Sequence, residues 1–408
     1  MGDGHVRRVA IVEPVRTAVG GFGGGLRPVP AEELAARVIE ALVDRTGIDP
    51  AVIDDVSMAQ SYANSEAPCI GRWAALQAGL PIEVPGFQTD RRCGGGLQAV
   101  ATAAMMVQTG AADVVIAGGV ESMSRIEHYT TTARWGSRSG DQILYDRLDR
   151  GRARSQPEWR FGKISGMIET AENLAERYGI GREEADAYAV RSHRRAAAAW
   201  DSGAFADEVV PVDVPQRRGD PVVFDRDEGI RPESSPATLA KLRTVMPDGT
   251  VTAGNSAQQN DAAAGCLIVA EERLDDLGLT PSAWFEGWAA VGCDPATMGL
   301  GPVGAVHKLF ARTGVGFDDL ALIEINEAFA VQVLAVLREW GLTLDELDDR
   351  LNVNGSGISL GHPIGATGTR ILATMLHELG RRGGGLALET MCIGGGQGIA
   401  ALFRGEPR

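Results

Sequence analysis

The sequence predicts an α/β protein of two similar halves, with a loop-rich segment inserted into the first half. Short apolar runs of strand length alternate with helical patterns, which is typical of mainly parallel sheets covered by helices. Two stretches of the chain also resemble each other in sequence and in the order of their elements. The alternation of strands and helices is broken between about residues 123 and 250, which indicates the insertion.

The repeat is clearest where a helix ends and a strand follows. Leu42-Val-Asp-Arg-Thr-Gly-Ile matches Leu309-Phe-Ala-Arg-Thr-Gly-Val in its helix end, its turn glycine and its next apolar residue. Each segment is followed by an apolar run that predicts a strand, at 56–59 and at 320–325. This agreement in the order of elements favours duplication over chance.

The likeness continues further along each half. A small-residue helix expected from Gly94 to Val107 precedes a strand and a glycine pair, and a helix expected from Thr367 to Leu379 precedes a strand and a glycine run. Duplication predicts a pseudo-twofold axis between the halves. Because Cys93 and His362 stand just before these two helices, we expect them to face each other across that axis.

The insertion has a different composition from the halves. Arg, Trp, Pro and Gly crowd residues 134–161, and a long amphipathic helix is expected from 169 to 199. The chain returns to the first half near Thr252, and the residues that follow supply a strand that this half otherwise lacks. We therefore expect a first half over residues 1–273, with the insertion at about 123–250, and a second half over residues 274–408.

Charge and cysteine content narrow the functional class. The chain has 408 residues and a formal net charge of −15, which argues against a nucleic-acid or anionic-membrane partner. Five cysteines without close pairing, no membrane-length apolar run and no signal-peptide core near the start predict a soluble cytoplasmic protein. Basic residues concentrate in the middle third, which suits either a small polyanionic ligand or a solvated surface.

Cys93 is the first candidate catalytic residue. It lies in Asp90-Arg-Arg-Cys-Gly-Gly-Gly, ahead of the small-residue helix. A helix N-terminus favours a thiolate, and the glycines let substrate approach backbone N–H groups that hold an oxyanion. A buried structural cysteine is the alternative.

His362 and Cys392 each lie in a glycine-rich loop. Gly361-His-Pro-Ile-Gly-Ala-Thr-Gly leaves room beside an imidazole that can act as a base to a thiol and as a donor to a carbonyl oxygen. Cys392 follows a strand and precedes Gly394-Gly-Gly, where a second thiol suits proton transfer. Asn326, in Asn326-Glu-Ala-Phe-Ala, can hold a water or a carbonyl, although this junction also has an ordinary structural interpretation.

Other interpretations of these motifs fit less well. The glycine runs lack the Gly-Lys-Ser/Thr of a phosphate loop, and the run at Gly20 fails the dinucleotide spacing. A zinc site formed by Cys93, His362 and Cys392 lacks a Cys-x-x-Cys pair and a fourth ligand. We expect no metal site.

Together the four motifs resemble the signature set of the thiolase family, in the family's order and over nearly the whole chain. The resemblance implies a five-layer α-β-α-β-α sandwich of two five-stranded mixed sheets. It implies that Cys93 carries the acyl group, that His362 activates the Cys93 thiol, and that Cys392 moves the α-proton. Backbone N–H groups of Cys93 and Gly394 would form one oxyanion hole, and His362 with a water held by Asn326 would form the other.

The resemblance also implies the ligands. It implies that acyl-CoA and coenzyme A are substrates, that no cofactor is required, and that the chain assembles as a homodimer or homotetramer. Arg231 resembles the family's CoA-contacting arginine. The other residues expected to bind substrate are Met167, Ala253, Gly254, Ser256 and Phe329.

The chain departs from the family pattern at several positions. Ala257 stands where a serine is usual, Ser356 where the second glycine of Asn-Gly-Gly is usual, and Gly166 where many short-chain members have histidine. All three residues after Cys93 are glycine. These changes leave the reacting groups in place but alter the expected acyl and pantetheine contacts.

Three functions compete. A decarboxylating ketoacyl synthase has a second histidine where Cys392 stands, and a non-catalytic acyl-CoA carrier would be expected to lose one reacting residue. Because Cys93, His362 and Cys392 are all present, the sequence favours an acyl-CoA:acetyl-CoA C-acyltransferase. It leaves acyl chain length, direction and pathway open.

Overall fold

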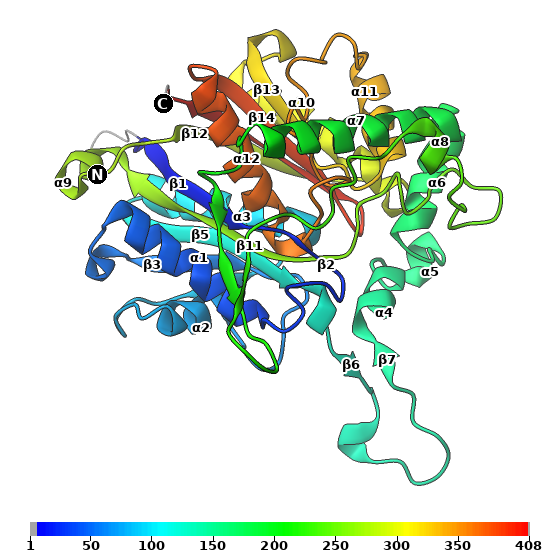
Figure 1. Cartoon of the computed structure of the whole chain (residues 1–408), viewed down its shortest axis with the longest axis horizontal. Helices are drawn as coiled ribbons and strands as arrows, with labels where there is room; N and C mark the ends of the chain where they lie inside the picture. The colour runs from blue at the N-terminus through cyan, green and yellow to red at the C-terminus, as the bar shows by residue number, and fades with distance from the viewer. Residues whose placement is uncertain (1–5, 407–408) are drawn as a thin grey trace.

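The first half forms a five-stranded sheet in the order β4-β3-β5-β11-β1 (Figure 1). The computed structural model describes residues 6–406, so the first five residues considered in the signal-peptide expectation lie outside the described part. The elements of this half are β1 (Val9–Thr17), β2 (Gly20–Gly21), α1 (Ala31–Thr46), β3 (Asp55–Ala59), α2 (Ile70–Gln77), β4 (Phe87–Thr89), α3 (Gly95–Gln108), β5 (Val114–Ser122), β11 (Asn260–Ala270) and α9 (Leu274–Leu277).

The second half repeats this strand order. Its sheet runs β13-β14-β15-β12. In each half the first strand of the chain, β1 or β12, therefore lies at one end of the sheet. The glycines that end α1 and α10 both adopt the left-handed conformation, with φ of 65° at Gly47 and 72° at Gly314. The elements are β12 (Ala283–Gly292), α10 (Gly301–Thr313), β13 (Leu320–Ile325), α11 (Ala330–Trp340), α12 (Thr367–Arg381), β14 (Gly385–Ile393) and β15 (Gln397–Gly405).

The fifth strand expected in the second sheet is reduced to an isolated parallel bridge between Ile323 and Leu351. Asn352 explains the reduction. Its backbone is left-handed, with φ of 46°, which interrupts an extended segment. Its side-chain amide instead bonds the main chain of β13, accepting from the N–H of Ile325 and donating to the carbonyl of Ile325, both at 2.9 Å.

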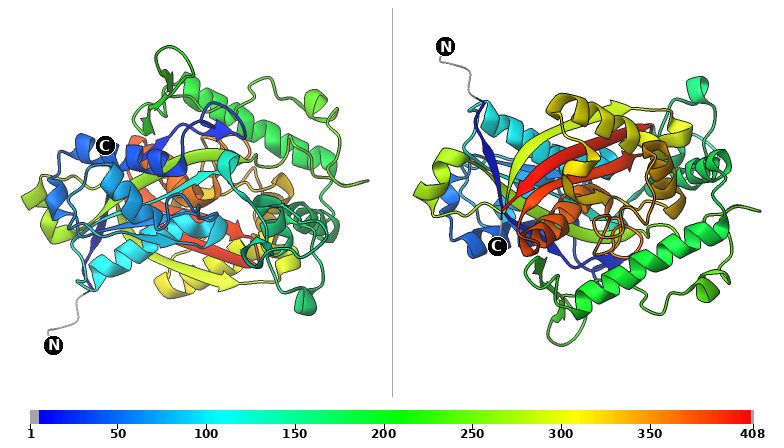
Figure 2. Two further views of the ribbon diagram at one scale, coloured as in Figure 1. Left: turned by 90° about the horizontal axis from the view of Figure 1, so that it is seen from below. Right: turned by 90° about the horizontal axis from the view of Figure 1, so that it is seen from above.

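Alternation along the strands produces the five layers. In β1, Ala10 and Val12 pack in the core beneath α1 and α2, while Val9 and Ile11 face the core that contains α3 and α12. Strands of both sheets contribute to this middle core, and α10 and α11 cover the outer face of the second sheet. Figure 2 shows these layers in two opposite views, each perpendicular to the view of Figure 1. The sheets join where β1 pairs with β12 at Ala10–Trp284 and Ile11–Ala283.

Two glycines allow the central helices to approach closely. A Cβ at Gly368 of α12 would lie 2.3 Å from the backbone nitrogen of Leu97 in α3, and one at Gly96 would lie 2.6 Å from the Thr369 hydroxyl. Only glycine fits at such contacts. The approach brings the N-terminal ends of α3 and α12 together, so Cys93 and His362 meet as the repeat predicts.

The insertion carries an extended arm and a helical cover. The predicted helix over 169–199 is wrong as one element, because Gly179, left-handed with φ of 60°, ends α6 before α7 begins. The arm contains the β6–β7 pair and projects from the body (Figure 1). The elements are β6 (His128–Tyr129), β7 (Tyr145–Asp146), α4 (Arg147–Ala153), α5 (Glu158–Phe161), α6 (Met167–Tyr178), α7 (Arg182–Asp201), β8 (Val209–Val210), β9 (Val212–Val214), β10 (Val222–Phe224) and α8 (Pro236–Leu239).

The insertion is also tied into the main sheet. Strand β8 pairs in parallel with the end of β1, at Arg16–Val209 and Thr17–Val210. The buried guanidinium of Arg16 bonds Glu208 at 2.6 Å and Asp227 at 2.8 Å, and both carboxylates belong to the insertion. Within residues 6–406, no helix has the length and apolar character needed to cross a membrane.

Candidate active site

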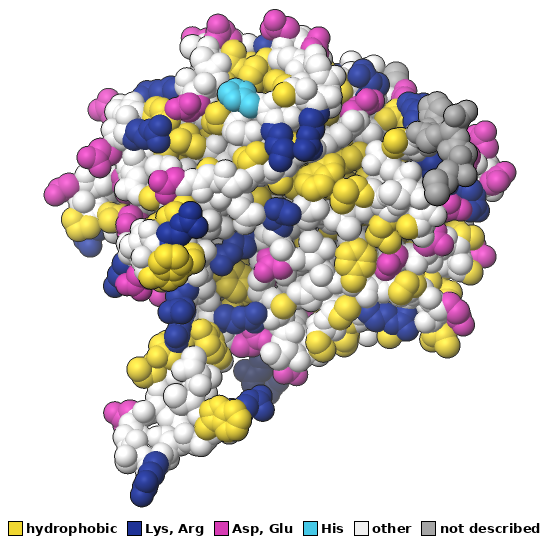
Figure 3. Space-filling view, turned by 180° about the vertical axis from the view of Figure 1, so that it is seen from behind, with side chains coloured by type: hydrophobic (Ala, Val, Ile, Leu, Met, Phe, Trp, Pro, Cys, Tyr) yellow, Lys and Arg dark blue, Asp and Glu magenta, His cyan; other side chains and the backbone are white. Residues whose placement is uncertain are grey.

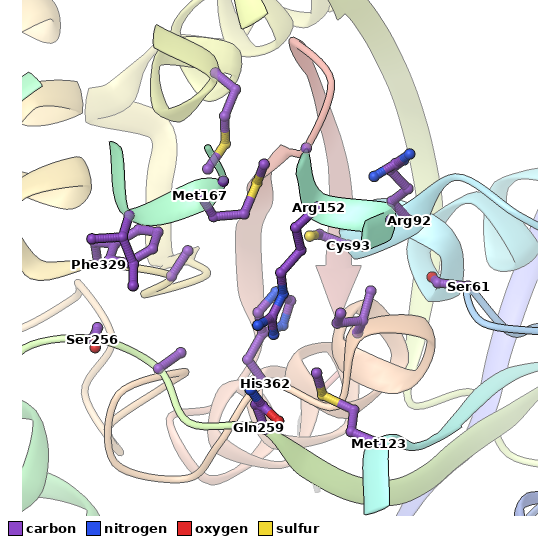
Figure 4. Close-up of a pocket in the computed structure, with 18 of the residues that line it drawn as sticks. Ser61, Arg92, Cys93, Met123, Arg152, Met167, Ser256, Gln259, Phe329 and His362 are labelled. Carbon is purple, nitrogen blue, oxygen red and sulfur yellow. The ribbon is translucent and has the colours of Figure 1, made fainter. Parts of the chain in front are cut away.

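A cavity of about 430 Å³ lies where the two halves and the insertion meet (Figure 4). Phe329, Ser256 and Met167 lie on one side of it, and Ser61 and Arg92 lie on the other. Its lining includes Cys93, His362, Cys392 and Gly394. Three distant stretches of sequence thus supply the proposed reacting groups to one space.

Cys93 lies in a 3-10 turn (Arg92–Gly94) that leads into α3. Burial raises the pKa of its thiol above the ordinary value, although the backbone N–H groups of Gly394 and Cys93 and the charge of Arg92 lower it. The net shift is therefore opposite to the thiolate stabilisation expected from a helix N-terminus, because desolvation outweighs these groups. The backbone N–H of Gly394, the second expected oxyanion donor, is close enough to the Cys93 sulfur to lower the pKa of that thiol.

His362 is held from several directions. Its backbone N–H donates to Oδ1 of Asn260 at 2.9 Å, and its ring Nδ1 lies 2.6 Å from the hydroxyl of Thr367. Because Nδ1 is occupied, Nε2 is the nitrogen left for the cavity. Burial, with the charges of Arg370 and Arg152, lowers the imidazole pKa to about 3, so the resting His362 is neutral.

Asn326 lies behind His362 and does not line the cavity. Its Nδ2 is 3.5 Å from Nδ1 of His362, and its buried Oδ1 has no hydrogen-bond partner within the described residues. The neighbouring Glu327 is fully buried and accepts bonds from Tyr188, Ser192 and Asn352. Glu327 thus anchors this junction to α7.

Cys392 lies inside β14, one residue before the strand ends, rather than beyond the strand as the sequence suggested. It is buried against the outer core of the second half and also lines the cavity. Burial, together with the nearby Cys93 and Cys293, raises its pKa well above the ordinary thiol value. Its resting form is the thiol, which can give a proton before it takes one.

Glu121 is a residue whose role the sequence left unassigned, although it lies in Gly118-Gly-Val-Glu. Its buried carboxylate accepts N–H bonds from Ser61 at 3.1 Å, Tyr62 at 3.2 Å and Gly365 at 3.0 Å. Burial raises its pKa to about 7 despite these bonds. The carboxylate thereby joins the loop after β3 to the loop that carries His362.

The expected substrate-binding residues divide into two groups. Met167, Ser256 and Phe329 line the cavity. On this wall Ser256 forms an antiparallel backbone bridge with Phe329, and its hydroxyl donates to the carbonyl of Thr252. Ala253, Gly254 and Arg231 do not line it. The Arg231 guanidinium bonds the carbonyls of Glu228 and Ile230 outside the cavity.

Two arginines in the cavity were not assigned to it from sequence. Arg92, directly before the nucleophile, has a left-handed backbone with φ of 47°, and Arg152 comes from α4. Both line the cavity. The zinc interpretation gains no support, since the described residues contain no group of three His, Cys, Asp or Glu side chains placed to hold a metal.

Comparisons with known proteins agree with this geometry. Residues 9–272 match the family model for the thiolase N-terminal domain, and residues 279–405 match that for the thiolase C-terminal domain. The chain belongs to the thiolase family. The resemblance and the implied layered fold are thus confirmed, except for the fifth strand of the second sheet.

Named relatives cover nearly the full chain. An acetyl-CoA acetyltransferase of Chromobacterium violaceum is 47% identical over 96% of this chain and 98% of its own length, and one of Pseudomonas aeruginosa is 44% identical over the same shares. The crystal structure of the Bacillus anthracis acetyl-CoA acetyltransferase has a TM-score of 0.93 and 39% identity over 99% of this chain and 100% of its own. Human mitochondrial 3-ketoacyl-CoA thiolase in complex with CoA has a TM-score of 0.91 and 37% identity over 98% of each chain.

Proposed function

We propose that this protein is an acyl-CoA:acetyl-CoA C-acyltransferase that cleaves 3-ketoacyl-CoA with coenzyme A, or runs the reverse condensation, through an acyl-enzyme on Cys93. The meeting of Cys93, His362 and Cys392 in one cavity carries the proposal. The names of the relatives, acetyl-CoA acetyltransferase and 3-ketoacyl-CoA thiolase, support it.

In the cleavage direction, His362 takes the proton of Cys93 and the sulfur attacks the 3-keto carbon. The Gly394 and Cys93 N–H groups stabilise the oxyanion, since donors fixed beforehand need no reorganisation during reaction. The bond between the α-carbon and the keto carbon then breaks. The acyl group stays on Cys93, and the acetyl-CoA carbanion takes the proton of Cys392. The thiol of coenzyme A next attacks the acyl-enzyme, and its proton returns the site to its starting state.

The raised pKa of Cys392 suits this sequence of events, because a resting thiol is ready to protonate the leaving carbanion. In condensation the same group takes a proton from acetyl-CoA. Asn326, through a water, assists His362 at the thioester carbonyl. The unpartnered, buried amide oxygen of Asn326 supports this role.

Coenzyme A enters in this proposal along Met167, Ser256 and Phe329, and Ala253 and Gly254, just before Ser256 in the chain, are further contacts for it. Arg231 contacts the nucleotide end of the molecule. Lys and Arg side chains gather where the insertion joins the body (Figure 3), which suits the phosphates of coenzyme A.

We also propose a homo-oligomer in the cytoplasm. The arm exposes apolar side chains, with Trp135 at 88% and Leu144 at 67% exposure, and a second copy of the chain is the partner that covers them. Light scattering of the purified protein tests this proposal, because a monomer would contradict it.

Acyl transfer to Cys93 is the step that tests the function. After incubation with acetyl-CoA, peptide mass spectrometry should find one acetyl group on Cys93, and Cys93→Ala should neither be acetylated nor turn over. Acetylation elsewhere alone, or normal turnover by Cys93→Ala, would exclude this mechanism. The ketoacyl-synthase alternative predicts decarboxylation of a malonyl thioester, which this protein should not catalyse.

A further inference from the structure

The side of the cavity opposite Met167, Ser256 and Phe329 carries an unusual charge. Arg92 and Arg152 both line it, and Figure 4 shows the Arg152 side chain reaching toward His362 beside Cys93. Both arginines are half-buried. Two cations in one partly desolvated space repel each other unless an anion lies with them.

The protein supplies no such anion within the described residues. The only side-chain bond of Arg92 is from Nη1 to the neutral hydroxyl of Ser155, at 3.0 Å, and the Arg152 guanidinium forms no hydrogen bond or ion pair. Asp90 and Asp149 also line the cavity, but both are exposed and neither pairs with these arginines. Asp90 instead accepts the backbone N–H of Arg92 at 2.7 Å.

A third polar group stands on the same side. The hydroxyl oxygen of Ser61 is buried, lines the cavity and has no hydrogen-bond partner in the described chain. Its backbone N–H is held by Glu121, so its position is fixed. Met123 and Ile364 supply apolar surface to the same cavity.

The phosphates of coenzyme A are not the anion that fits here. The pantetheine arm separates them from the reactive sulfur, so they lie far from any group beside Cys93. A guanidinium beside Cys93 meets the acyl chain instead.

From this arrangement we propose that the preferred substrate is a short 3-ketoacyl-CoA whose acyl chain ends in a carboxylate. This inference rests on the proposed thiolase function and names its substrate class. Arg152 binds the terminal carboxylate, and Arg92 with the Ser61 hydroxyl completes the anion site, because guanidinium–carboxylate bonds are strong and directional. Cleavage would release acetyl-CoA and leave the shortened chain, carboxylate included, on Cys93 for transfer to coenzyme A.

Matched substrates test the inference. Thiolysis rates are measured for pairs of 3-ketoacyl-CoA thioesters of equal carbon count, one ending in a methyl group and one in a carboxylate, across several short lengths. The wild-type protein should favour the carboxylate by about tenfold or more in kcat/KM at its best length, as expected for hydrogen bonds to a charged group. A preference for the methyl-ended chain at every length would overturn the proposal.

Variants of Arg152 locate the effect. Arg152→Met should remove most of the preference, and Arg152→Lys should keep part of it. Arg154→Met is the matched control, since Arg154 ends the same helix, is exposed and does not line the cavity. If Arg152→Met keeps the wild-type ratio, or loses equal activity on both substrates, Arg152 is not the carboxylate-binding residue.

Acylation of Cys93 gives a second readout, followed by mass spectrometry with short acyl-CoA thioesters ending in a methyl or a carboxylate group. It also shows whether each variant is folded, since a folded variant still accepts acetyl. A wild-type protein that acylates Cys93 and cleaves only methyl-ended chains overturns this inference alone. A protein whose Cys93 accepts no acyl group overturns the proposed function as well.

Discussion

The hydroxyl of Thr367 lies 2.6 Å from Nδ1 of His362, at the first residue of α12. This contact fixes the plane of the imidazole and reserves Nε2 for the cavity. A neutral hydrogen bond is worth about 1 kcal/mol, so its loss lowers a rate several-fold.

Thr367→Val should therefore lower kcat for thiolysis by about two- to tenfold and leave KM for coenzyme A nearly unchanged. Thr367→Ser keeps the hydroxyl and should retain most of the activity. Steady-state kinetics of the three proteins decide the matter. Loss in the serine variant together with full activity in the valine variant would assign the role to the methyl group instead.

Cys392→Ser should separate the two half-reactions. Serine keeps the size of the side chain, but its pKa is far too high for it to act as the base. The variant should still accept acetyl on Cys93 but fail to exchange the α-hydrogens of acetyl-CoA with deuterated solvent. Condensation should fall by about 10²- to 10⁴-fold, the usual contribution of positioned proton transfer.

Cys293→Ser is the control for this variant. Cys293 is close enough to affect the pKa of Cys392, yet it does not line the cavity. Its exchange rate should match the wild-type rate. Normal exchange in Cys392→Ser would move the carbon proton transfer to His362.

Arg231→Glu should raise KM for coenzyme A more than it lowers kcat, because a phosphate would then face a carboxylate. Arg312→Glu makes the same charge change on the exposed face of α10 and should leave KM as it is. Kinetics at varied coenzyme A concentration test the pair. An unchanged KM in Arg231→Glu would place the nucleotide elsewhere.

His193 predicts a loss of stability in acid. It is buried, its Nδ1 accepts the N–H of Arg231 at 3.2 Å, and burial with the charge of Arg231 lowers its pKa from 6.5 to about 4. Between those values the unfolded chain binds a proton that the folded chain does not, so stability falls as pH drops from 6.5 toward 4.

This group alone accounts for up to about 3 kcal/mol, since one pKa unit is worth about 1.4 kcal/mol. His193→Asn should lose less stability over the same pH range, as measured by urea denaturation at pH 7 and in acid. Parallel losses in the variant and the wild-type protein would assign the acid sensitivity to other buried groups, among them His362.

Local patterns were enough to predict much of the fold. The repeated helix ends at Gly47 and Gly314 are visible in the sequence as turn glycines, and both glycines do end their helices. The break at Gly179 was missed because the residues around it fit one continuous amphipathic pattern. The reduced fifth strand was missed because Asn352 replaces main-chain bonds with its side chain.

The site was predictable where chemistry and glycine spacing coincide, as at Cys93, His362 and Cys392. Other features depend on tertiary packing. The sequence does not reveal that Glu121 joins two loops whose residues lie 60 and 244 positions away. Nor does it reveal the net direction in which the pKa of the Cys93 thiol shifts, since desolvation outweighs the N–H groups only once the surrounding chain is in place.

The pairing of β1 also constrains how this protein is made. Arg16 and its partner Glu208 are 192 positions apart, and β11 and β12, which flank β1, come later still. During synthesis an apolar strand therefore leaves the ribosome long before any neighbour exists to pair with it. Pairing of β1 can begin with β8 and β11 but is complete only after β12, the first strand of the second half, has emerged. The nascent first half therefore depends on other means to avoid aggregation.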